Sequence, residues 1–384
     1  MKELLFLLLP FAFLSGWMTA RKRYRKSENK SHQLSHNFVQ GINLLLDEQP
    51  DKALEVFLNH PDIDEYTAET YLLIGNMFRA RGEVDRALKV HQNLIGRSNL
   101  HPDRKKSAML AYGEDFLVAG MLDRAEKVFT EVLENTDSDP KACAALRIIY
   151  EQLQQWDRAI DVTRCVEKHS NKDFGRYIAH YYCELAQLDL EKGNVHVVEK
   201  LLELAKKADK ELSRVLVIQG DLASRKQLPD EALKYYQAAI RQDSRLLSLL
   251  NSRLQSVTDD IGKDEKLKKF LMRIIDKNGD IQVLGYLIDV LSRNDISPQD
   301  IKYIESTFKS GTSSPATLMR LVSMWKEQTT DEDKIAQYDL IMGVLQEYLQ
   351  DRSDFQCQDC GYQMKEFIWR CPACQEWDTV AQIK

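Results

Sequence analysis

A recurring spacing of small residues constrains the fold of this 384-residue chain more than any other feature. In three segments a glycine is followed by alanine twelve positions later and by an aromatic side chain four positions after that. These segments are Gly41…Ala53…Phe57, Gly75…Ala87…His91 and Gly113…Ala125…Phe129. The small-residue series continues at Ala159, Val198 and Ala232, with successive steps of 34, 38, 34, 39 and 34 residues. A period of this length indicates helical units that stack in sequence.

The pattern resembles the tetratricopeptide repeat, in which two antiparallel helices form each unit. Helices approach closely where one side chain is small, so Ala87 and Ala125 would bring the second helix against the first. Gly82 and Gly120 fall where the turn between the helices needs a left-handed residue. We therefore predict an all-α repeat solenoid over residues 34–245.

Beyond Asp243 the repeat pattern weakens, although apolar residues such as Leu267, Leu271 and Ile274 keep helical spacing. We predict degenerate helical repeats over residues 246–351. A separate helical domain over the same residues is the alternative.

The N-terminus carries an apolar stretch, residues 4–20, whose 17 residues reach the lower limit for a membrane-spanning helix. The basic residues that follow at once are Arg21, Lys22, Arg23, Arg25 and Lys26. A cleaved signal peptide would carry its positive charge before the apolar run instead. We therefore predict a transmembrane anchor over residues 1–20 and a basic juxtamembrane linker over residues 21–33. Basic flanks stay on the cytoplasmic side of a membrane, which places the body of the chain there.

Four cysteines near the C-terminus have the spacing C-x2-C-x10-C-x2-C. They are Cys357, Cys360, Cys371 and Cys374. Each C-x-x-C turn points two sulfurs inward, so the four thiolates can surround one ion. The paired turns resemble those of rubredoxins, and we predict a small rubredoxin-like metal-binding domain over residues 352–384, called here the metal knuckle. Iron and zinc both accept four thiolates, so the spacing predicts one Fe or Zn ion without choosing between them.

The metal knuckle is too short to form a sufficient core without its ion. Its aromatic residues exceed what so small a unit needs, and we expect some of them to pack on the repeats. They are Tyr362, Phe367, Trp369 and Trp377.

The three remaining cysteines, Cys143, Cys165 and Cys183, lie singly in helical segments. We expect them to be unpaired thiols, which agrees with a reducing compartment. His180 lies three residues before Cys183, on the same face of a helix. This pair could ligate a metal, but without a second pair we favour buried packing residues. His91 is likewise expected to pack in the aromatic position of its repeat.

The first helix of each repeat lines the inner face of a solenoid. On this basis we predict that Asn76, Arg79, Ser107 and Glu114 contact a partner, with ordinary solvated helix residues as the alternative. The chain has no phosphate-binding loop, nucleophile elbow or H-E-x-x-H motif, so nothing in it indicates an enzyme. A net charge of −6 likewise gives no indication of nucleic-acid binding.

The order of anchor, repeats and metal knuckle resembles the lipopolysaccharide assembly protein B family over the whole chain. The motifs that carry this resemblance are the opening Glu3-Leu-Leu-Phe-Leu-Leu-Leu-Pro10, residues 75–87, residues 179–186, Cys357-x-x-Cys-Gly and Trp369-x-Cys-Pro-x-Cys374. The resemblance implies a single-pass protein of the cell inner membrane, with a periplasmic N-terminus and a cytoplasmic body.

The same resemblance implies a regulator of lipopolysaccharide biosynthesis. Its partners would be the membrane protease FtsH, the committed-step deacetylase LpxC, and proteins of lipopolysaccharide synthesis or transport. A homo-oligomer is compatible with such a scaffold. The alternative function is a rubredoxin-type electron-transfer protein tethered to the membrane.

Overall fold

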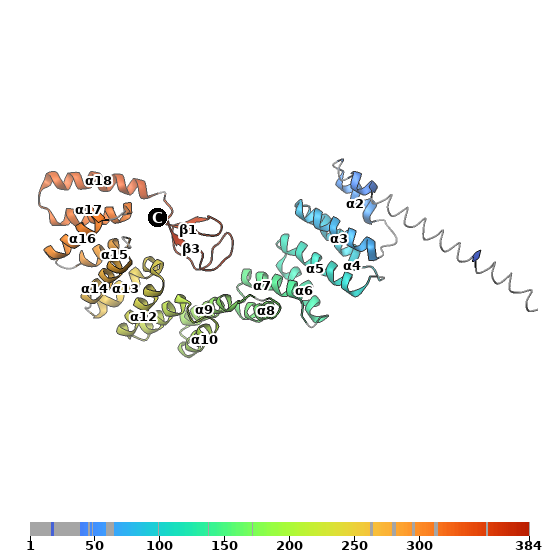
Figure 1. The fold of residues 1–384 in the computed structure, drawn as a ribbon, viewed down its shortest axis with the longest axis horizontal. Helices are drawn as coiled ribbons and strands as arrows, with labels where there is room; N and C mark the ends of the chain where they lie inside the picture. Colours follow the sequence, from blue (N-terminus) through green and yellow to red (C-terminus); the bar gives the residue numbers. More distant parts are fainter. Residues whose placement is uncertain are drawn as a thin grey trace, which may run out of the picture. The chain divides into compact units, whose positions relative to one another are not determined.

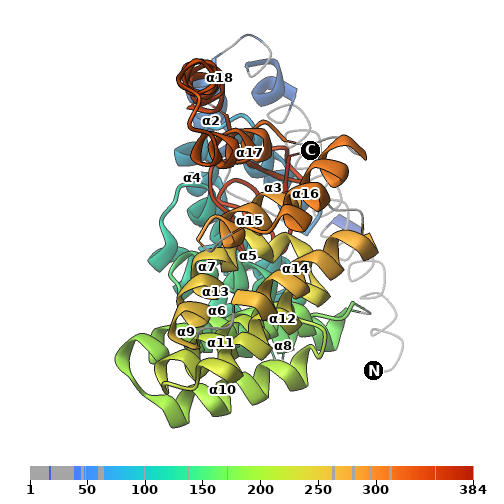
Figure 2. The ribbon, with the colours of Figure 1, turned by 90° about the vertical axis from the view of Figure 1, so that its left-hand side faces the viewer.

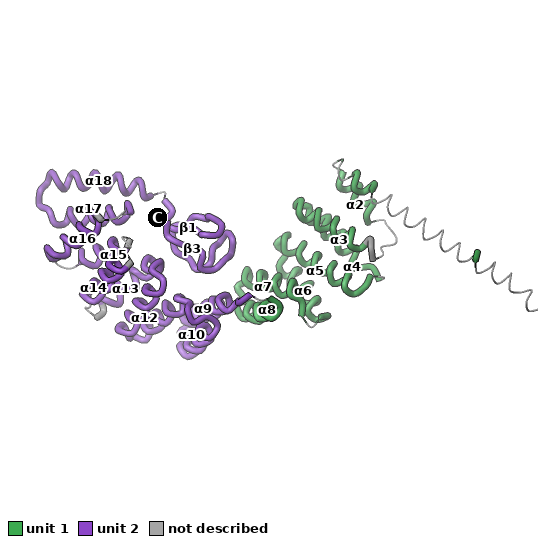
Figure 3. The backbone as a smooth tube through the Cα atoms, in the orientation of Figure 1, with its two compact units in different colours: residues 1–171 green, residues 172–384 purple. Residues whose placement is uncertain are grey.

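The structure is a computed structural model of the whole chain. The residues it describes are 17–18, 39–44, 47, 49–58, 65–98, 100–136, 138–170, 172–261, 264–278, 282–293, 296–310, 314–350 and 352–383. They form helices throughout, apart from a small sheet close to the C-terminus (Figures 1 and 2). The chain divides into two compact units, residues 1–171 and residues 172–384 (Figure 3).

The predicted anchor over residues 1–20 lies outside the described residues, except for Trp17 and Met18. The predicted linker over residues 21–33 lies wholly outside them. Among the residues that are described, no helix combines the length and apolarity needed to cross a membrane.

Unit 1 consists of helices that pack in antiparallel pairs, α3 with α4, α5 with α6, and α7 with α8. The helices are α2 (Pro50–Leu58), α3 (Glu65–Ala80), α4 (Val84–Ile95), α5 (Pro102–Val118), α6 (Leu122–Glu134), α7 (Pro140–Gln152) and α8 (Trp156–His169).

Unit 2 continues the pairing, with α9 against α10 and α11 against α12, and ends in the metal knuckle. Its helices are α9 (Gly175–Lys192), α10 (Val195–Ala208), α11 (Ser213–Arg225), α12 (Pro229–Gln242), the 3-10 helix η2 (Ser244–Leu246), α13 (Leu247–Ile261), α14 (Asp264–Asn278), α15 (Gln282–Leu291), α16 (Pro298–Ser310), α17 (Pro315–Gln328) and α18 (Glu332–Gln350). Its strands are β1 (Phe355–Cys357), β2 (Gln363–Met364) and β3 (Val380–Gln382).

The small residues that define the repeat period are all completely buried. Their exposed fraction is 0% at Ala53, Ala87, Ala125, Ala159, Val198 and Ala232. In α5 the glycine of the pattern makes room for a ring, because a Cβ atom added at Gly113 would lie 2.7 Å from Cζ of Phe129. The predicted tetratricopeptide repeats are therefore confirmed at their close helix contacts.

The turn inside each of these helix pairs contains a left-handed residue. Gly82 and Gly120 have φ angles of 80° and 71°, which confirms the prediction for the turns α3–α4 and α5–α6. Gln154 and Gln227 take the same conformation with φ of 56° and 59°, although they are not glycine. The turn geometry is thus common to the repeats, and a non-glycine residue there costs about 1–2 kcal/mol.

The core of unit 2 runs without a break from α11 through α17. It includes Ala232 and Tyr236 of α12, Leu250 of α13 and Leu321 of α17. Helices α13 to α17 therefore bury apolar faces against one another, whereas α18 has no buried residue.

The metal knuckle contains a three-stranded antiparallel sheet in the order β2-β1-β3. Phe355 of β1 lies opposite Met364 of β2 and Gln382 of β3. The strands return the chain so that both C-x-x-C turns reach the same end of the sheet.

Candidate metal centre

The two C-x-x-C turns have the same backbone hydrogen bonds. In the first turn the amide of Gly361 donates to the Cys357 carbonyl at 3.0 Å. In the second turn the amide of Gln375 donates to the Cys371 carbonyl at 2.9 Å. Gly361 and Gln375 are both left-handed, with φ of 77° and 65°. Each turn therefore presents its two cysteine sulfurs to the other turn.

The four cysteine sulfurs lie within 4.8 Å of one another. The Sγ atoms of Cys357 and Cys374 are 3.6 Å apart, and those of Cys360 and Cys371 are also 3.6 Å apart. A tetrahedral ion with bonds of about 2.3 Å to sulfur requires sulfurs about 3.8 Å apart. The geometry fits one tetrathiolate metal ion, as the spacing predicted.

The electrostatics of the cluster favour a cation. Burial alone would raise the pKa of Cys357, but hydrogen bonds involving the Thr379 hydroxyl and the amides of Cys360 and Asp359 lower it to about 6. A hydrogen bond from the amide of Glu376 lowers the pKa of Cys374, but burial and the neighbouring thiols outweigh it and raise the pKa to about 12. A bound cation would offset the mutual repulsion of four thiolates at this site.

The metal knuckle packs on unit 2 through its aromatic side chains. Trp377 stacks on His180 of α9 with ring centroids 4.5 Å apart and an interplanar angle of 19°. Phe367 and Trp369 pack against the apolar core of the unit. The guanidinium of Arg214 lies 5.5 Å from the Trp369 ring. The expectation that knuckle aromatics pack on the repeats is confirmed for these three; Tyr362 remains 47% exposed.

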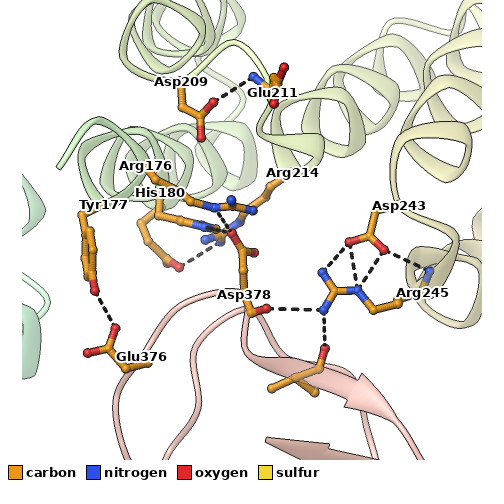
Figure 4. Close-up of polar contacts among 12 residues, drawn as sticks. Arg176, Tyr177, His180, Asp209, Glu211, Arg214, Asp243, Arg245, Glu376 and Asp378 are labelled. Carbon is orange, nitrogen blue, oxygen red and sulfur yellow. Dashed lines mark hydrogen bonds and ion pairs between the residues drawn. The ribbon is translucent and has the colours of Figure 1, made fainter. Parts of the chain in front are cut away.

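Polar contacts also join α9 to the metal knuckle (Figure 4). The Asp378 carboxylate accepts hydrogen bonds from Nε2 of His180 at 2.8 Å and Nε of Arg176 at 2.7 Å. The Tyr177 hydroxyl donates to the Glu376 carboxylate at 2.6 Å. Together, α9 and the loop of residues 376–378 form what we call the docking surface of the metal knuckle.

A second attachment comes from η2. Nη1 of Arg245 donates to the carbonyl of Val380 at 3.1 Å, at the start of β3 (Figure 4). The Asp243 carboxylate holds this guanidinium in place, with a 2.8 Å ion pair. The knuckle is thus bound at two points of unit 2.

The His180–Asp378 pair is nearly sealed from solvent, with side chains 0% and 10% exposed. Burial lowers the pKa of His180, and its hydrogen bond to Asp378 offsets this only in part. Burial would raise the pKa of Asp378, but the hydrogen bonds and charges of His180 and Arg176 hold it below its usual range. Because a carboxylate can only accept, Nε2 of His180 carries the proton.

His180 and Cys183 are both completely buried, which confirms the packing role that we favoured for them. Cys183 is completely buried, and burial raises the pKa of its thiol to about 12. Sequence reasoning did not find that His180 holds the metal knuckle. Its partner Asp378 is 198 residues away, and no spacing pattern connects them.

Three of the four predicted partner-binding residues lie together in unit 1. The Arg79 guanidinium donates to the Glu114 carboxylate at 2.6 Å and to the Asn76 side chain at 2.9 Å. Ser107 lies apart from them and donates to the backbone carbonyl of Asp103 at 3.0 Å. Arg79 therefore ties α3 to α5, and a role of these residues in partner contact stays a prediction.

A buried acid beneath this group escaped the sequence analysis. The Asp115 carboxylate is completely buried and lies 2.8 Å from Nη1 of Arg79 and 2.5 Å from Nδ1 of His91. The expected packing role of His91 is confirmed, since its ring is completely buried against Gly75. The sequence did not indicate that Asp115 is buried, because acidic residues on helices are usually solvated.

The expectation of unpaired thiols is wrong for Cys143 and Cys165, which form a disulfide between α7 and α8. The residues are 22 positions apart. The hairpin of the repeat brings them together, because the two antiparallel helices pack along their length. Separate helical positions in the sequence gave no sign of this contact.

The fold and the site define a class, the tetratricopeptide-repeat proteins that carry a rubredoxin-type tetrathiolate site packed on their helices. A tetratricopeptide repeat model matches residues 70–105 and 142–163. A model described as rubredoxin metal binding domain matches residues 355–382.

The chain belongs to the lipopolysaccharide assembly protein B family. It is 31% identical over 385 residues to lipopolysaccharide assembly protein B of Escherichia coli (strain K12), covering 100% of this chain and 99% of the relative. The protein of the same name from Haemophilus influenzae is 28% identical over 397 residues, with 100% and 98% covered. The family resemblance seen in the sequence is thereby confirmed.

Among solved structures, the crystal structure of MamA protein matches 47% of this chain and 93% of its own, at 19% identity and a TM-score of 0.33. A score this low adds nothing to the repeat assignment, which rests on the family model and the helix pairs.

Proposed function

We propose that this protein is a non-enzymatic adaptor that regulates lipopolysaccharide biosynthesis at the inner membrane. In this proposal the repeats hold LpxC where the membrane protease FtsH can degrade it, and they link synthesis to transport. Residues 1–20 anchor the chain, with the N-terminus in the periplasm and the body on the cytoplasmic side. The repeats occupy residues 34–245 and their degenerate continuation residues 246–351.

The observation that carries the proposal is the full-length relationship to lipopolysaccharide assembly protein B. It covers 100% of this chain and 99% of the relative, so it includes the N-terminal segment, both helical regions and the metal knuckle. An interaction role also suits the architecture, because stacked helix pairs expose long surfaces for partners.

The metal site supports a structural role within that proposal. Cys357 and Cys371 are almost completely buried, and the loop beside the site is occupied by contacts of Glu376 and Asp378 with α9. When bound, the ion would hold both C-x-x-C turns together and so keep this loop in place. The residues that would hold it are Cys357, Cys360, Cys371 and Cys374.

The test is the lifetime of LpxC in cells that lack the natural regulator. The full chain, or a variant without residues 1–20, is expressed at matched levels, and LpxC is followed after protein synthesis is stopped. We expect the full chain to shorten the LpxC lifetime only while FtsH is present, and the shortened variant to have no effect. An LpxC lifetime that does not respond to the full chain would refute the degradation role. Full activity of the shortened variant would refute the need for an anchor.

A matched experiment separates the adaptor from an electron carrier. Chains loaded with zinc or with iron are compared in a reconstituted degradation assay with FtsH and LpxC. An adaptor should work equally with both metals, since zinc has no redox chemistry. Degradation that occurs only with iron would favour the electron-transfer alternative.

A further inference from the structure

The Cys143–Cys165 disulfide joins a completely buried residue to a partly exposed one. Cys143 of α7 is completely buried. Cys165 of α8 is only partly buried, and its Sγ lies 3.3 Å from the Ser138 hydroxyl. Cys165 is therefore the residue of the pair that an external thiol can approach, while Cys143 is covered.

Exposed basic side chains lie on the surface of α8 beside Cys165. Lys168 and His169 lie three and four residues after Cys165 in the last helical turn, and both are exposed. Residues at these spacings are neighbours on a helix surface. The acids of this part of α8 are Asp161, which is paired with Arg164 at 4.0 Å, and the half-buried Glu167. A negatively charged reagent that approaches Cys165 would thus meet the ammonium of Lys168.

The metal knuckle indicates the redox conditions in which the protein works. Its four cysteines bind an ion only as free thiolates, so the protein needs conditions in which thiols persist. Disulfides found under such conditions are usually transient or redox-sensing. The buried position of Cys143 suits both states, because a free cysteine packs like a small apolar residue.

We propose that Cys143 and Cys165 form a thiol–disulfide exchange site, at which an anionic low-molecular-weight thiol such as glutathione reacts with the Cys165 sulfur. The thiolate attacks Sγ of Cys165, which forms a mixed disulfide and releases Cys143 as a thiolate that takes up a proton. A second external thiolate then attacks the sulfur that the first external thiol contributed to the mixed disulfide. This step releases Cys165 as a thiolate and yields the disulfide of the low-molecular-weight thiol. Two electrons pass from the two external thiols to the protein disulfide.

Exchange at this site would remove the covalent link within the α7–α8 pair. The role is independent of the proposed adaptor function, because it concerns only the state of unit 1. Cys183 in unit 2 provides an internal control, since it is completely buried and carries no disulfide.

The test uses the zinc-loaded full chain and oxidised glutathione, with each cysteine read separately by peptide mapping. We expect Cys143→Ser to form one glutathione adduct at Cys165, whereas Cys165→Ser forms none at Cys143 while folded. Cys183 should stay unmodified in both variants. Absence of the adduct at Cys165, or an adduct on buried Cys143, would overturn the proposal.

Two further measurements examine reversibility and the role of Lys168. In glutathione buffers of increasing reducing strength, both wild-type thiols should appear together while the helices remain folded. A disulfide that persists until the repeats unfold would make the link purely structural, and two free thiols in oxidising buffer would show that no link forms.

Lys168→Glu should slow reduction by glutathione about fivefold at low ionic strength and leave reduction by neutral 2-mercaptoethanol unchanged. Equal effects on both thiols would refute the selection of an anionic thiol.

Discussion

The attachment of the metal knuckle to α9 should depend on the charge of Asp378. In Asp378→Asn the side chain keeps its size, and asparagine tolerates the left-handed backbone at this position, where φ is 58°. The variant loses the charge on an acceptor of two hydrogen bonds, from His180 at 2.8 Å and Arg176 at 2.7 Å. Both hydrogen bonds reach the same oxygen, Oδ2, so the amide oxygen of the asparagine can still accept them, but as a neutral acceptor.

The loss of docking free energy comes mainly from the buried hydrogen bond between His180 and residue 378. The His180 side chain is 0% exposed, so replacing its charged acceptor by a neutral one costs about 1–1.5 kcal/mol. The Arg176 side chain is 59% exposed, and solvent screening reduces its share to about 0.5 kcal/mol. We therefore expect a loss of about 2 kcal/mol, which corresponds to about a 30-fold larger undocked population.

Hydrogen exchange of the zinc-loaded full chain measures this population. Amides of residues 370–383 and of the first turns of α9 should exchange about 30-fold faster in Asp378→Asn, while the chain keeps one metal ion. The matched control is Glu366→Gln, which removes the same charge from an exposed position of the metal knuckle. Unchanged exchange in Asp378→Asn, or an equal change in the control, would refute the role assigned to this carboxylate.

Three other predictions concern the repeats, the metal and pH. Ala125→Leu should overpack the completely buried contact between α5 and α6 and lower stability by about 1–3 kcal/mol, whereas Lys127→Leu on the exposed side should leave the melting temperature unchanged. Single serine variants of the four metal cysteines should each lose the ion, and Cys183→Ser should retain it; a knuckle variant that stays metallated would contradict a shared site. Burial lowers the pKa of His180 in the docked state, so on acidification the undocked state is protonated at a higher pH. Docking should therefore weaken as the pH falls below about 6.5, by at most about 1.4 kcal/mol per pH unit. Melting temperatures of wild type and His180→Gln between about pH 7.5 and 5.5 check this, and equal slopes would contradict it.

The repeats and the metal ligands could be predicted because their physics is local and periodic. Each helix pair needs a small residue at the same contact, so Ala87 and Ala125 mark the period and are completely buried. A tetrathiolate site needs two tight turns, and each of these is contained within a few residues. In both cases the sequence itself holds the spacing that the structure uses.

The turns were predicted only in part, because residue type is a local signal and not every left-handed residue is a glycine. Glycine marks the turns at Gly82 and Gly120, but Gln154 and Gln227 take the same left-handed conformation. Packing of the flanking helices imposes that conformation where the residue type does not favour it. The helix pairs α7–α8 and α11–α12 were therefore recognised from their small residues and not from their turns.

Only the tertiary structure decided which distant side chains meet. The docking surface joins His180 to Asp378 across 198 residues, and the disulfide joins Cys143 to Cys165 across 22. Such contacts depend on how helices and loops stack in three dimensions, and the stacking follows from the burial of many apolar side chains at once. No single residue type or spacing encodes that sum, so a buried histidine and its carboxylate look like unrelated residues until the chain is folded.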